Sequence, residues 1–266
     1  MTDTGKFRFP GSKSDLERRI TQWGKDLDLP VSWLRQYISS SVLITMLSRS
    51  RNIEGYPSFV LKGGTSMVMR FGTHARATKD FDAAYRGFSR DISNSLSAAL
   101  ADPLWQFEAT FKERGSFGGD RLQVLVYRYQ IAIKYLGDPF NTIKMEVTLQ
   151  PSAESERVDA ILDLSPVRLP LPTDLELLAI GKQIGEKWHA CTEPDREGIP
   201  NDRVTDIYDL HLLFRVFENS GSTGELRMIC GEIFIARDIH SWPVEISLRA
   251  GWQEVWATTG SVGSRS

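Results

Sequence analysis

The chain has 266 residues, a formal net charge of −2 and 41% hydrophobic residues. These values exclude a disordered or fibrous protein and allow one large or two small domains. The near-neutral charge excludes a global basic field, so any RNA contact requires a local patch. Cys191 and Cys230 are too few for a disulfide framework and too far apart for a metal motif. No apolar signal region or membrane-length run is present, so we expect a cytoplasmic protein without a membrane segment.

Residues 1–54 predict a loose polar arm followed by helices that support the core. Ser14 is expected to cap the first helix, with Glu17 three positions on, and this helix should run to Gly24. A second helix is expected after Pro30, because apolar residues from Val31 onward recur at helical spacing.

The next stretch predicts a place for phosphate groups. Phe59–Lys62 is expected to be a short strand that ends in the paired glycines Gly63 and Gly64, with a helix over Thr65–Phe71. Backbone N–H groups at a helix N-terminus stabilise phosphate oxygens. Lys62 stands where an ammonium could reach a triphosphate, and its place beside the paired glycines favours this role over that of a solvated loop lysine.

Two carboxylates one residue apart follow on a second predicted strand. Side chains on a strand alternate between faces, so Asp80 and Asp82 should share a face with Thr78, whereas Phe81 points into the opposite layer. Like charges this close are costly unless a cation lies between them, and Mg²⁺ prefers carboxylates together with substrate phosphates. Arg76 either orients these acids, holds a substrate phosphate or forms a structural ion pair.

The middle of the chain predicts a helix and then mostly strands. The expected elements are a helix over 91–100, a strand from Phe107, a turn over 115–119, and strands over 122–135 and 142–149. Glu146 lies among apolar neighbours on the last strand, where an acid is a depleted choice. It is either a metal ligand, a general base or an acid paired across an edge of the sheet.

The last third predicts helices after a proline-rich connector. The connector spans 151–172 and includes a strand-like piece over 160–164. Thr173–Glu176 resembles a capping box that would start a helix running to Ala190. Further helices are expected over 203–216, 225–237 and 243–256, before a tail that is disordered by composition.

Three groups of residues resemble the AbiEii/AbiGii family of nucleotidyltransferase toxins. They are Lys62-Gly-Gly-Thr-Ser66, then Arg76-x-Thr-x-Asp-Phe-Asp82, and finally Lys187 followed by Asp206-x-x-Asp209, and the resemblance runs from about Phe59 to Leu213. It implies an α+β fold of the DNA polymerase β type: a minimal nucleotidyltransferase mixed sheet followed by a helical C-terminal domain. The expected domains are 1–54 (arm and helices), 55–168 (core), 169–258 (helical) and 259–266 (tail).

The resemblance also implies a role for each site residue. Asp80 and Asp82 would hold Mg²⁺, with Mn²⁺ as the alternative ion, and Glu146 matches the third carboxylate of such enzymes. Lys187 would clamp the triphosphate, unless it only complements the helix dipole. Asp209 would position Lys187 or the acceptor, while Asp206 pairs with Arg203. The expected nucleotide-binding residues are Lys62, Gly63, Gly64, Thr65, Arg76 and Thr78.

The implied function is that of a toxin from a toxin–antitoxin or phage-defence pair. It would transfer a nucleotidyl group from an NTP to the 3′ end of tRNA and so block translation, with Arg70, Arg76, Arg86 and Arg90 as an RNA patch. A cognate antitoxin could inhibit it through phosphorylation of Thr78. Two alternatives stay open: nucleotidylation of a protein hydroxyl, and a non-catalytic nucleotide-binding module in which the acids are structural.

Overall fold

The computed structural model describes residues 8–119, 122–195, 200–219, 221–247, 249 and 251–254. The chain divides into two compact units. The first, which we call the sheet unit, comprises Met1–Gly72 and Ala77–Leu177. The second, which we call the helical unit, comprises Thr73–Arg76 and Leu178–Ser266. The predicted arm before residue 8 and the predicted tail lie outside the described residues.

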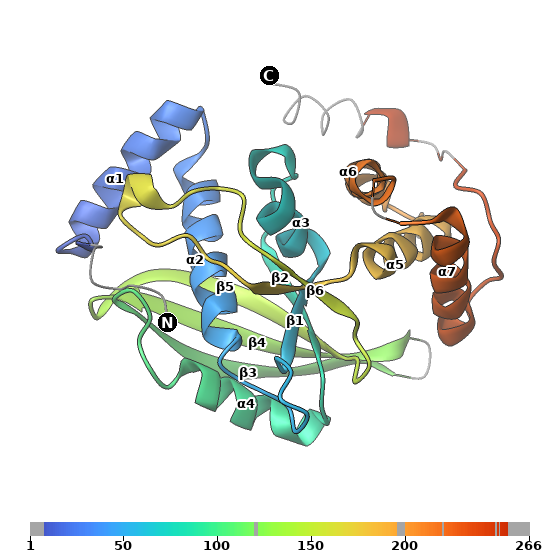
Figure 1. The fold of residues 1–266 in the computed structure, drawn as a ribbon, viewed down its shortest axis with the longest axis horizontal. Helices are drawn as coiled ribbons and strands as arrows, with labels where there is room; N and C mark the ends of the chain where they lie inside the picture. The colour runs from blue at the N-terminus through green and yellow to red at the C-terminus, as the bar shows by residue number, and fades with distance from the viewer. Residues whose placement is uncertain are drawn as a thin grey trace. The chain divides into compact units, whose positions relative to one another are not determined.

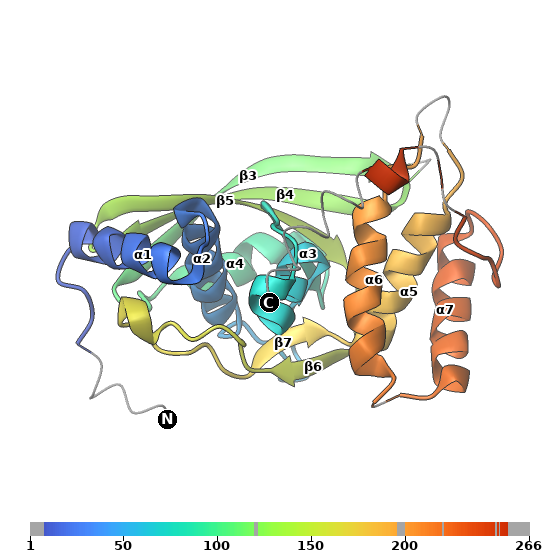
Figure 2. The ribbon, with the colours of Figure 1, turned by 90° about the horizontal axis from the view of Figure 1, so that it is seen from above.

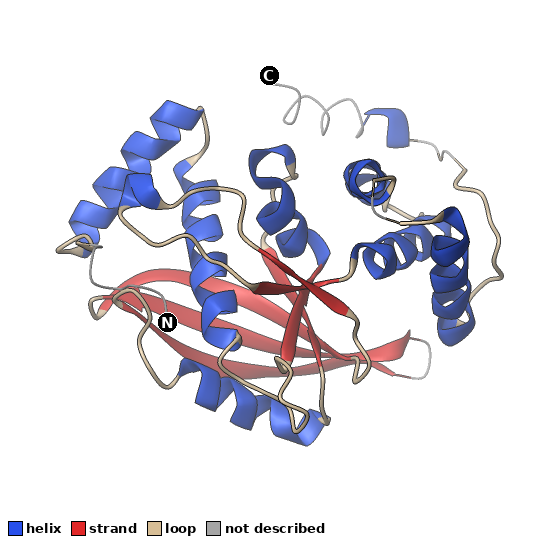
Figure 3. Ribbon diagram, viewed as in Figure 1, coloured by secondary structure: helices blue, strands red, loops and turns tan. Residues whose placement is uncertain are grey.

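The sheet unit combines helices with one mixed sheet (Figures 1 and 3). Its helices are α1 (Lys13–Leu27), α2 (Val31–Leu47), α3 (Gly63–Phe71) and α4 (Ile92–Leu100), with short 3₁₀ turns at Ser89–Asp91 and Ser165–Val167. Its strands are β1 (Phe59–Lys62), β2 (Asp80–Tyr85), β3 (Phe107–Gly119), β4 (Leu122–Tyr135), β5 (Asp138–Leu149), β6 (Ser155–Val158) and β7 (Leu175–Leu178).

Within the described residues, seven strands form a single sheet in the order β3-β4-β5-β2-β1-β7-β6. Strand β2 pairs with β5 in parallel and with β1 in antiparallel orientation. The strand that carries Asp80 and Asp82 therefore lies inside the sheet, with a strand hydrogen-bonded on each side. This confirms the expected α+β class with a mixed sheet.

The alternation of side chains divides this sheet into an apolar face and a charged face. Phe81 and Met145 point to the apolar face and are 0% and 1% exposed. Helix α4 packs there, because Tyr85 Oη lies 2.7 Å from Ser95 Oγ. Helix α2 packs there too, and Asn141 donates to Ser39 Oγ at 3.0 Å. Figure 2 shows α1, α2 and α3 on one side of the long strands.

In its described residues, the helical unit contains three packed helices and a single helical turn at 252–254. The helices are α5 (Ile180–Thr192), α6 (Val204–Phe217) and α7 (Thr223–Arg237), and α5 contacts both of the others. Their shared core includes Ile184, Leu213 and Phe234, which are 0–2% exposed. Both cysteines are free and buried there, and burial raises the pKa of Cys191 to about 12 and that of Cys230 to about 11. Both thiols are therefore protonated and unreactive at neutral pH.

The capping box predicted at Thr173–Glu176 is wrong. Leu175–Leu178 is a fully buried strand, β7, which runs parallel to β1 with Leu61 opposite Leu177. Glu176 does not turn back to cap a helix: its carboxylate accepts hydrogen bonds from Ser155 Oγ and from Arg157 Nε. Pairing with a distant strand outweighs the local capping pattern, and helix α5 begins later, at Ile180.

Helix α1 shows a smaller correction at its start. It begins at Lys13, and Ser12, not Ser14, is the cap, because Ser12 Oγ accepts a hydrogen bond from the Asp15 amide at 3.1 Å. The helix also runs past Gly24, as far as Leu27. Helices α2 and α6 and strands β1 and β4 confirm the corresponding predictions within a residue or two.

Three further predicted segments differ from the structure. The turn expected over 115–119 belongs to β3, which continues to Gly119 through irregular register. The strand-like piece at 160–164 is loop, and the strand lies just before it, at Ser155–Val158. The described residues of the final predicted helix are loop from Pro243 onward, with one helical turn at 252–254. No helix in the described part of the chain is long and apolar enough to cross a membrane.

Candidate active site

The paired glycines bring the start of helix α3 against the strand that carries the acids. Gly63 has φ +61°, and a Cβ placed on it would lie 2.8 Å from Asp82 Cγ and closer still to the carboxylate oxygen. A Cβ on Gly64 would lie 2.8 Å from Thr78 Oγ1. Real Cβ atoms do not approach other atoms this closely, so only glycine fits either position. The sequence pattern Gly63-Gly64 is therefore a packing requirement, whatever its role toward phosphate.

The N-terminus of α3 offers backbone donors beside Asp82. Among the described residues, no side chain caps this helix end, whose N-cap is Lys62. The N–H groups of Gly63, Gly64 and Thr65 belong to the first turn, which has no acceptor within its own helix. Thr65 Oγ1 is already engaged, because it donates to the Asp80 carbonyl at 2.7 Å. Thr65 could therefore serve a nucleotide through its amide and not through its hydroxyl.

Asp80 and Asp82, which we call the acid pair, lie on the charged face of β2. Asp80 is exposed and Asp82 half-buried, whereas Phe81 between them is fully buried. Asp82 stands in register between Lys62 on β1 and Glu146 on β5. The predicted common face is thus observed. Thr78, however, precedes β2 and is not part of it; its Oγ1 contacts the Asp80 carbonyl at 3.3 Å.

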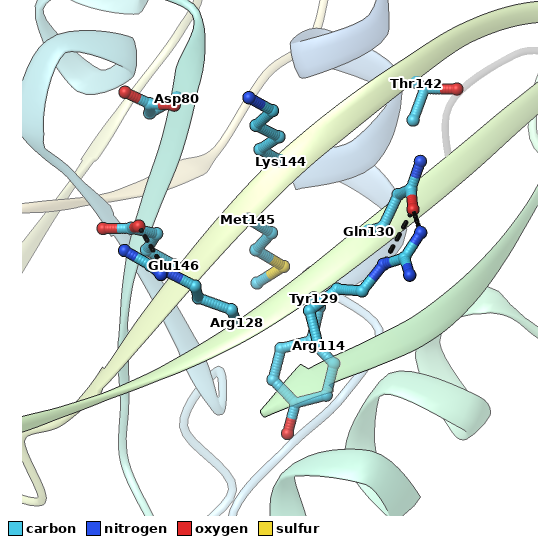
Figure 4. A pocket seen from close by; sticks show the side chains of 9 residues that line it. All are labelled: Asp80, Arg114, Arg128, Tyr129, Gln130, Thr142, Lys144, Met145 and Glu146. Atoms are coloured by element: carbon cyan, nitrogen blue, oxygen red, sulfur yellow. Dashed lines mark hydrogen bonds and ion pairs between the residues drawn. The ribbon is translucent and has the colours of Figure 1, made fainter. Parts of the chain in front are cut away.

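Glu146 lies on the same face, one strand away from the acid pair. Its strand is internal, so the expectation of an edge-strand acid is wrong. Its carboxylate accepts a hydrogen bond from Arg128 Nε at 3.1 Å, across the β4–β5 pair (Figure 4). Arg128 in turn lies over the Phe117 ring, 3.6 Å from its centroid. One of the expected alternatives, an acid paired across the sheet, is therefore present in the structure.

The donor set of the acid pair fits a divalent cation that is completed by substrate. In the ranges that the structure describes, no group of three or more His, Cys, Asp or Glu side chains could hold a metal ion alone. Mg²⁺ is typically bound through one or two carboxylates, with waters and substrate phosphates as further ligands. Asp80 and Asp82 supply two hard carboxylates next to a helix N-terminus that suits phosphate.

The helical unit contains a second cluster of predicted site residues, which we call the buried ion cluster: Arg76, Lys187, Asp206 and Asp209. Lys187 Nζ donates to Asp206 Oδ1 at 2.7 Å and to Asp209 Oδ2 at 2.6 Å. Arg76 Nε donates to the same oxygen of Asp209 at 3.2 Å. Asp209 is fully buried and Lys187 is 7% exposed.

Electrostatics favour the charged form of Lys187 in this cluster. Burial by itself would lower the pKa of Lys187, but attraction to Asp206 and Asp209 outweighs burial, and the pKa is raised. Asp206, expected to pair only with Arg203, contacts Lys187 more closely than it contacts Arg203, at 2.7 Å against 3.7 Å. Arg76 forms an ion pair with Asp209 within this cluster. Of the three roles predicted for Arg76, this contact matches the structural ion pair.

The arginines expected to form an RNA patch are mostly committed to the fold. The side chain of Arg70 is 6% exposed and is ion-paired with Glu156. Arg86 donates to the Ala153 carbonyl and to Ser155 Oγ. Arg90 is the most exposed of the set, with 81% of its side chain accessible. The prediction of an RNA patch is therefore wrong for Arg70 and Arg86, because their guanidinium groups bind other residues of the protein.

A mixed sheet with a glycine-paired helix start beside two same-face carboxylates defines a nucleotidyltransferase-type protein. The family model described as nucleotidyl transferase AbiEii toxin, type IV toxin–antitoxin system, matches residues 46–258. The chain belongs to this family of nucleotidyltransferase toxins, which confirms the resemblance noted in the sequence. The family implies an NTP substrate and an antitoxin partner.

Among solved structures, the chain is similar to MenT4, a nucleotidyltransferase toxin from Mycobacterium tuberculosis H37Rv. The two are 17% identical, with a TM-score of 0.55 over 89% of this chain and 75% of the other. At this identity the likeness establishes the fold. Comparison with curated protein sequences gives no match.

Gly63→Ala should destabilise the protein by more than backbone strain alone. Gly55 has φ +83° and no atom within 4 Å of where a Cβ would lie, so Gly55→Ala reports the strain without the clash. Both variants should lose roughly 1–2 kcal/mol from left-handed backbone strain. Gly63→Ala should lose about 1–3 kcal/mol more, through crowding against Asp82. Urea unfolding measures both, and equal losses would show that Asp82 does not crowd Gly63.

The buried ion cluster predicts a large cost for Lys187→Met. Removing the cation leaves Asp206 and Asp209 buried with less compensation, which should cost about 3–5 kcal/mol of unfolding free energy. Lys182 on the same helix pairs with the exposed Glu232, so Lys182→Met should cost at most about 1 kcal/mol. Denaturant unfolding followed by circular dichroism compares the two, and similar small losses would contradict a coupled cluster.

The same cluster predicts a pH dependence. Because the pKa of Lys187 is raised in the folded state, its stabilisation is fully present below the ordinary lysine pKa of about 10.4 and is lost as pH rises through the folded value. Wild type should therefore lose stability in this alkaline range more steeply than Lys187→Met does, as urea unfolding at a series of pH values would measure.

Proposed function

We propose that this family member transfers a nucleotidyl group from an NTP to RNA, with the 3′ end of tRNA as acceptor, in the cytoplasm. The observation that carries the proposal is the acid pair on one face of β2, pressed against the glycine-rich start of α3. Carboxylates for a cation and amides for a triphosphate meet there, and an RNA hydroxyl is the acceptor that the family resemblance favours. A nucleotidylated 3′ end cannot be aminoacylated, so translation would stop.

The triphosphate is assigned to the N-terminus of α3. The amides of Gly63, Gly64 and Thr65 would bind its oxygens, and Lys62 at the end of β1 adds a positive charge. Asp80 and Asp82 would hold a divalent cation, Mg²⁺ by preference for oxygen donors, which supplies charge neutralisation for the phosphates when bound. The assay below identifies the metal and the NTP.

The reaction is an in-line displacement at the α-phosphorus. The acceptor hydroxyl oxygen forms a bond to this phosphorus, the bond to the bridging oxygen breaks, and pyrophosphate leaves with the electron pair. Glu146 is the proposed acceptor of the hydroxyl proton, because its carboxylate shares the face of the acid pair and is oriented by Arg128.

Lys187, Asp206 and Asp209 have a structural role in this proposal. Two donors of the Lys187 ammonium already bind Asp206 and Asp209, and Asp209 also accepts from Arg76. We propose that the cluster fixes the loop 73–76, which leads in the chain to β2, so it acts through position and not through contact with substrate.

The transfer reaction is tested with α-labelled NTPs, total tRNA and Mg²⁺. Wild type should label tRNA with at least one NTP, and Asp80→Asn should reduce labelling by roughly a hundredfold or more. Asp91, an acid in the 3₁₀ turn before α4 with 47% of its side chain exposed, provides the control Asp91→Asn, which should label like wild type. Chelation of the metal should abolish labelling.

Two outcomes would contradict the proposal. Label that appears on protein instead of tRNA would favour nucleotidylation of a protein hydroxyl. An absence of label on any acceptor, with equal NTP binding by wild type and Asp80→Asn, would leave a non-catalytic nucleotide-binding module.

Thr78 is the proposed point of control by the antitoxin. A Cβ placed on Gly64 would lie 2.8 Å from Thr78 Oγ1, so this hydroxyl lies beside the first turn of α3. A phosphate on this hydroxyl would add nearly two negative charges. It would also compete with the triphosphate for the same helix N-terminus, so modification should prevent nucleotide binding.

Intact-mass measurement after co-expression with the cognate antitoxin tests this control. Wild type should gain the mass of one phosphate and lose NTP binding. Thr78→Val, which lacks the hydroxyl, should gain none, and whatever activity it has should be the same with and without the antitoxin. A phosphate on Thr78→Val, or inhibition without any phosphate, would place the control elsewhere.

A further inference from the structure

The charged face of the sheet continues beyond the acid pair into a groove of about 760 Å³. It begins at Asp80 on β2 and Glu146 on β5 and extends across β4 to Arg114 on β3, as Figure 4 shows. We call this the basic groove. Its lining residues are Asp80, Arg114, Arg128, Tyr129, Gln130, Thr142, Lys144, Met145 and Glu146.

Three cations of the groove stand on three neighbouring strands. Lys144 is on β5, Arg128 on β4 and Arg114 on β3. Neighbouring strands are about 4.8 Å apart, so the three cations lie at successive positions across the sheet, each farther from β2 than the one before. Of the three, Arg128 is paired with Glu146, while in the described part of the chain no acidic side chain lies within ion-pair distance of Lys144 or Arg114.

Stability does not explain this arrangement. Arg114 and Lys144 are both exposed, and exposed charges contribute at most about 1 kcal/mol even when paired. Like charges gathered on one face repel each other, and the chain as a whole has a net charge of −2. A local basic surface on a slightly acidic protein points to an anionic ligand.

The two guanidinium groups are held in place. Arg114 donates to Gln130 Oε1 through Nε at 2.9 Å and through a second nitrogen. Arg128 is fixed by Glu146 and by stacking on Phe117. A planar guanidinium with restrained orientation binds phosphate oxygens through paired hydrogen bonds and also stacks on unpaired bases.

The strand order separates this groove from the nucleotide site. The α3 N-terminus follows directly from β1, which flanks β2 on one side, and the groove occupies β5, β4 and β3 on the other side. The acid pair lies between the two. One side can therefore take the donor triphosphate while the other takes the chain that carries the attacking hydroxyl.

We propose that the basic groove is the acceptor subsite and that it binds the backbone of a single-stranded RNA end. Phosphates of the strand bind Arg114, Arg128 and Lys144 in turn, which brings the terminal ribose to the acid pair. The proposal rests on the proposed function and adds to it the residues that select RNA. The three cations Arg114, Arg128 and Lys144 favour a phosphate backbone over an uncharged protein hydroxyl as the acceptor.

The test is RNA binding by the full chain in the absence of metal and NTP. The probe is a 5′-labelled single-stranded RNA of about twelve nucleotides, titrated by fluorescence anisotropy at several salt concentrations. Arg114→Gln with Lys144→Gln removes two charges from the groove. Arg18→Gln with Lys25→Gln removes one arginine and one lysine from α1, where both are exposed, as the matched control.

The groove variant should bind the probe roughly tenfold more weakly than wild type and the control. Its plot of log binding constant against log salt should be shallower by about 1.4, because each single-strand phosphate contact contributes about 0.7. In the transfer assay its KM for RNA should rise, whereas its KM for NTP stays near that of wild type.

Separate outcomes distinguish this inference from the proposed function. If wild type labels RNA and the groove variant binds the probe as tightly as the control, the groove is overturned and the transfer reaction stands. If wild type labels nothing but the groove variant loses RNA binding, the groove stands and the reaction fails. A rise in the KM for NTP without a loss of RNA binding would assign the groove to the nucleotide and overturn the proposal.

Discussion

The close approach of helix α3 to strand β2 is the constraint on which the candidate site depends. It requires that two consecutive residues lack a Cβ, since one would strike the Asp82 carboxylate and the other Thr78 Oγ1. The left-handed φ of Gly63 turns the chain from β1 directly into the helix. The result is a helix N-terminus, with its partial positive charge, against a carboxylate. Backbone amides and carboxylate oxygens thereby meet without a loop between them.

The second constraint is the alternation of side chains along β2 and β5. Phe81 and Met145 are buried on the apolar face, where α2 and α4 contact β5 and β2, and this burial keeps their neighbours Asp80, Asp82 and Glu146 on the opposite face. Burial of one phenylalanine is worth roughly 1.5–3 kcal/mol, which is enough to offset the repulsion of exposed carboxylates. A slip of one residue in register would exchange the two faces. The core therefore fixes the chemistry of the charged face.

The aspartates of the helical unit are stabilised in a different way from those of β2. Asp80 is exposed and Asp82 half-buried, whereas Asp206 and Asp209 are buried and pair with Lys187 and Arg76. Both pairs of aspartates look alike as motifs. Their burial separates the two pairs, because buried carboxylates must be paired within the protein and exposed ones need not be.

The sequence by itself determined the local features of this protein: strand β1, the paired glycines, the shared face of Asp80 and Asp82, and the family. These follow from backbone geometry and side-chain alternation, which act over a few residues. Only the tertiary structure decided which partner each group takes. It placed Leu175–Leu178 beside β1 instead of in a helix, enclosed Lys187 between two aspartates, and aligned Arg114, Arg128 and Lys144 across three strands. Such contacts join residues far apart in the chain, and short motifs do not encode them.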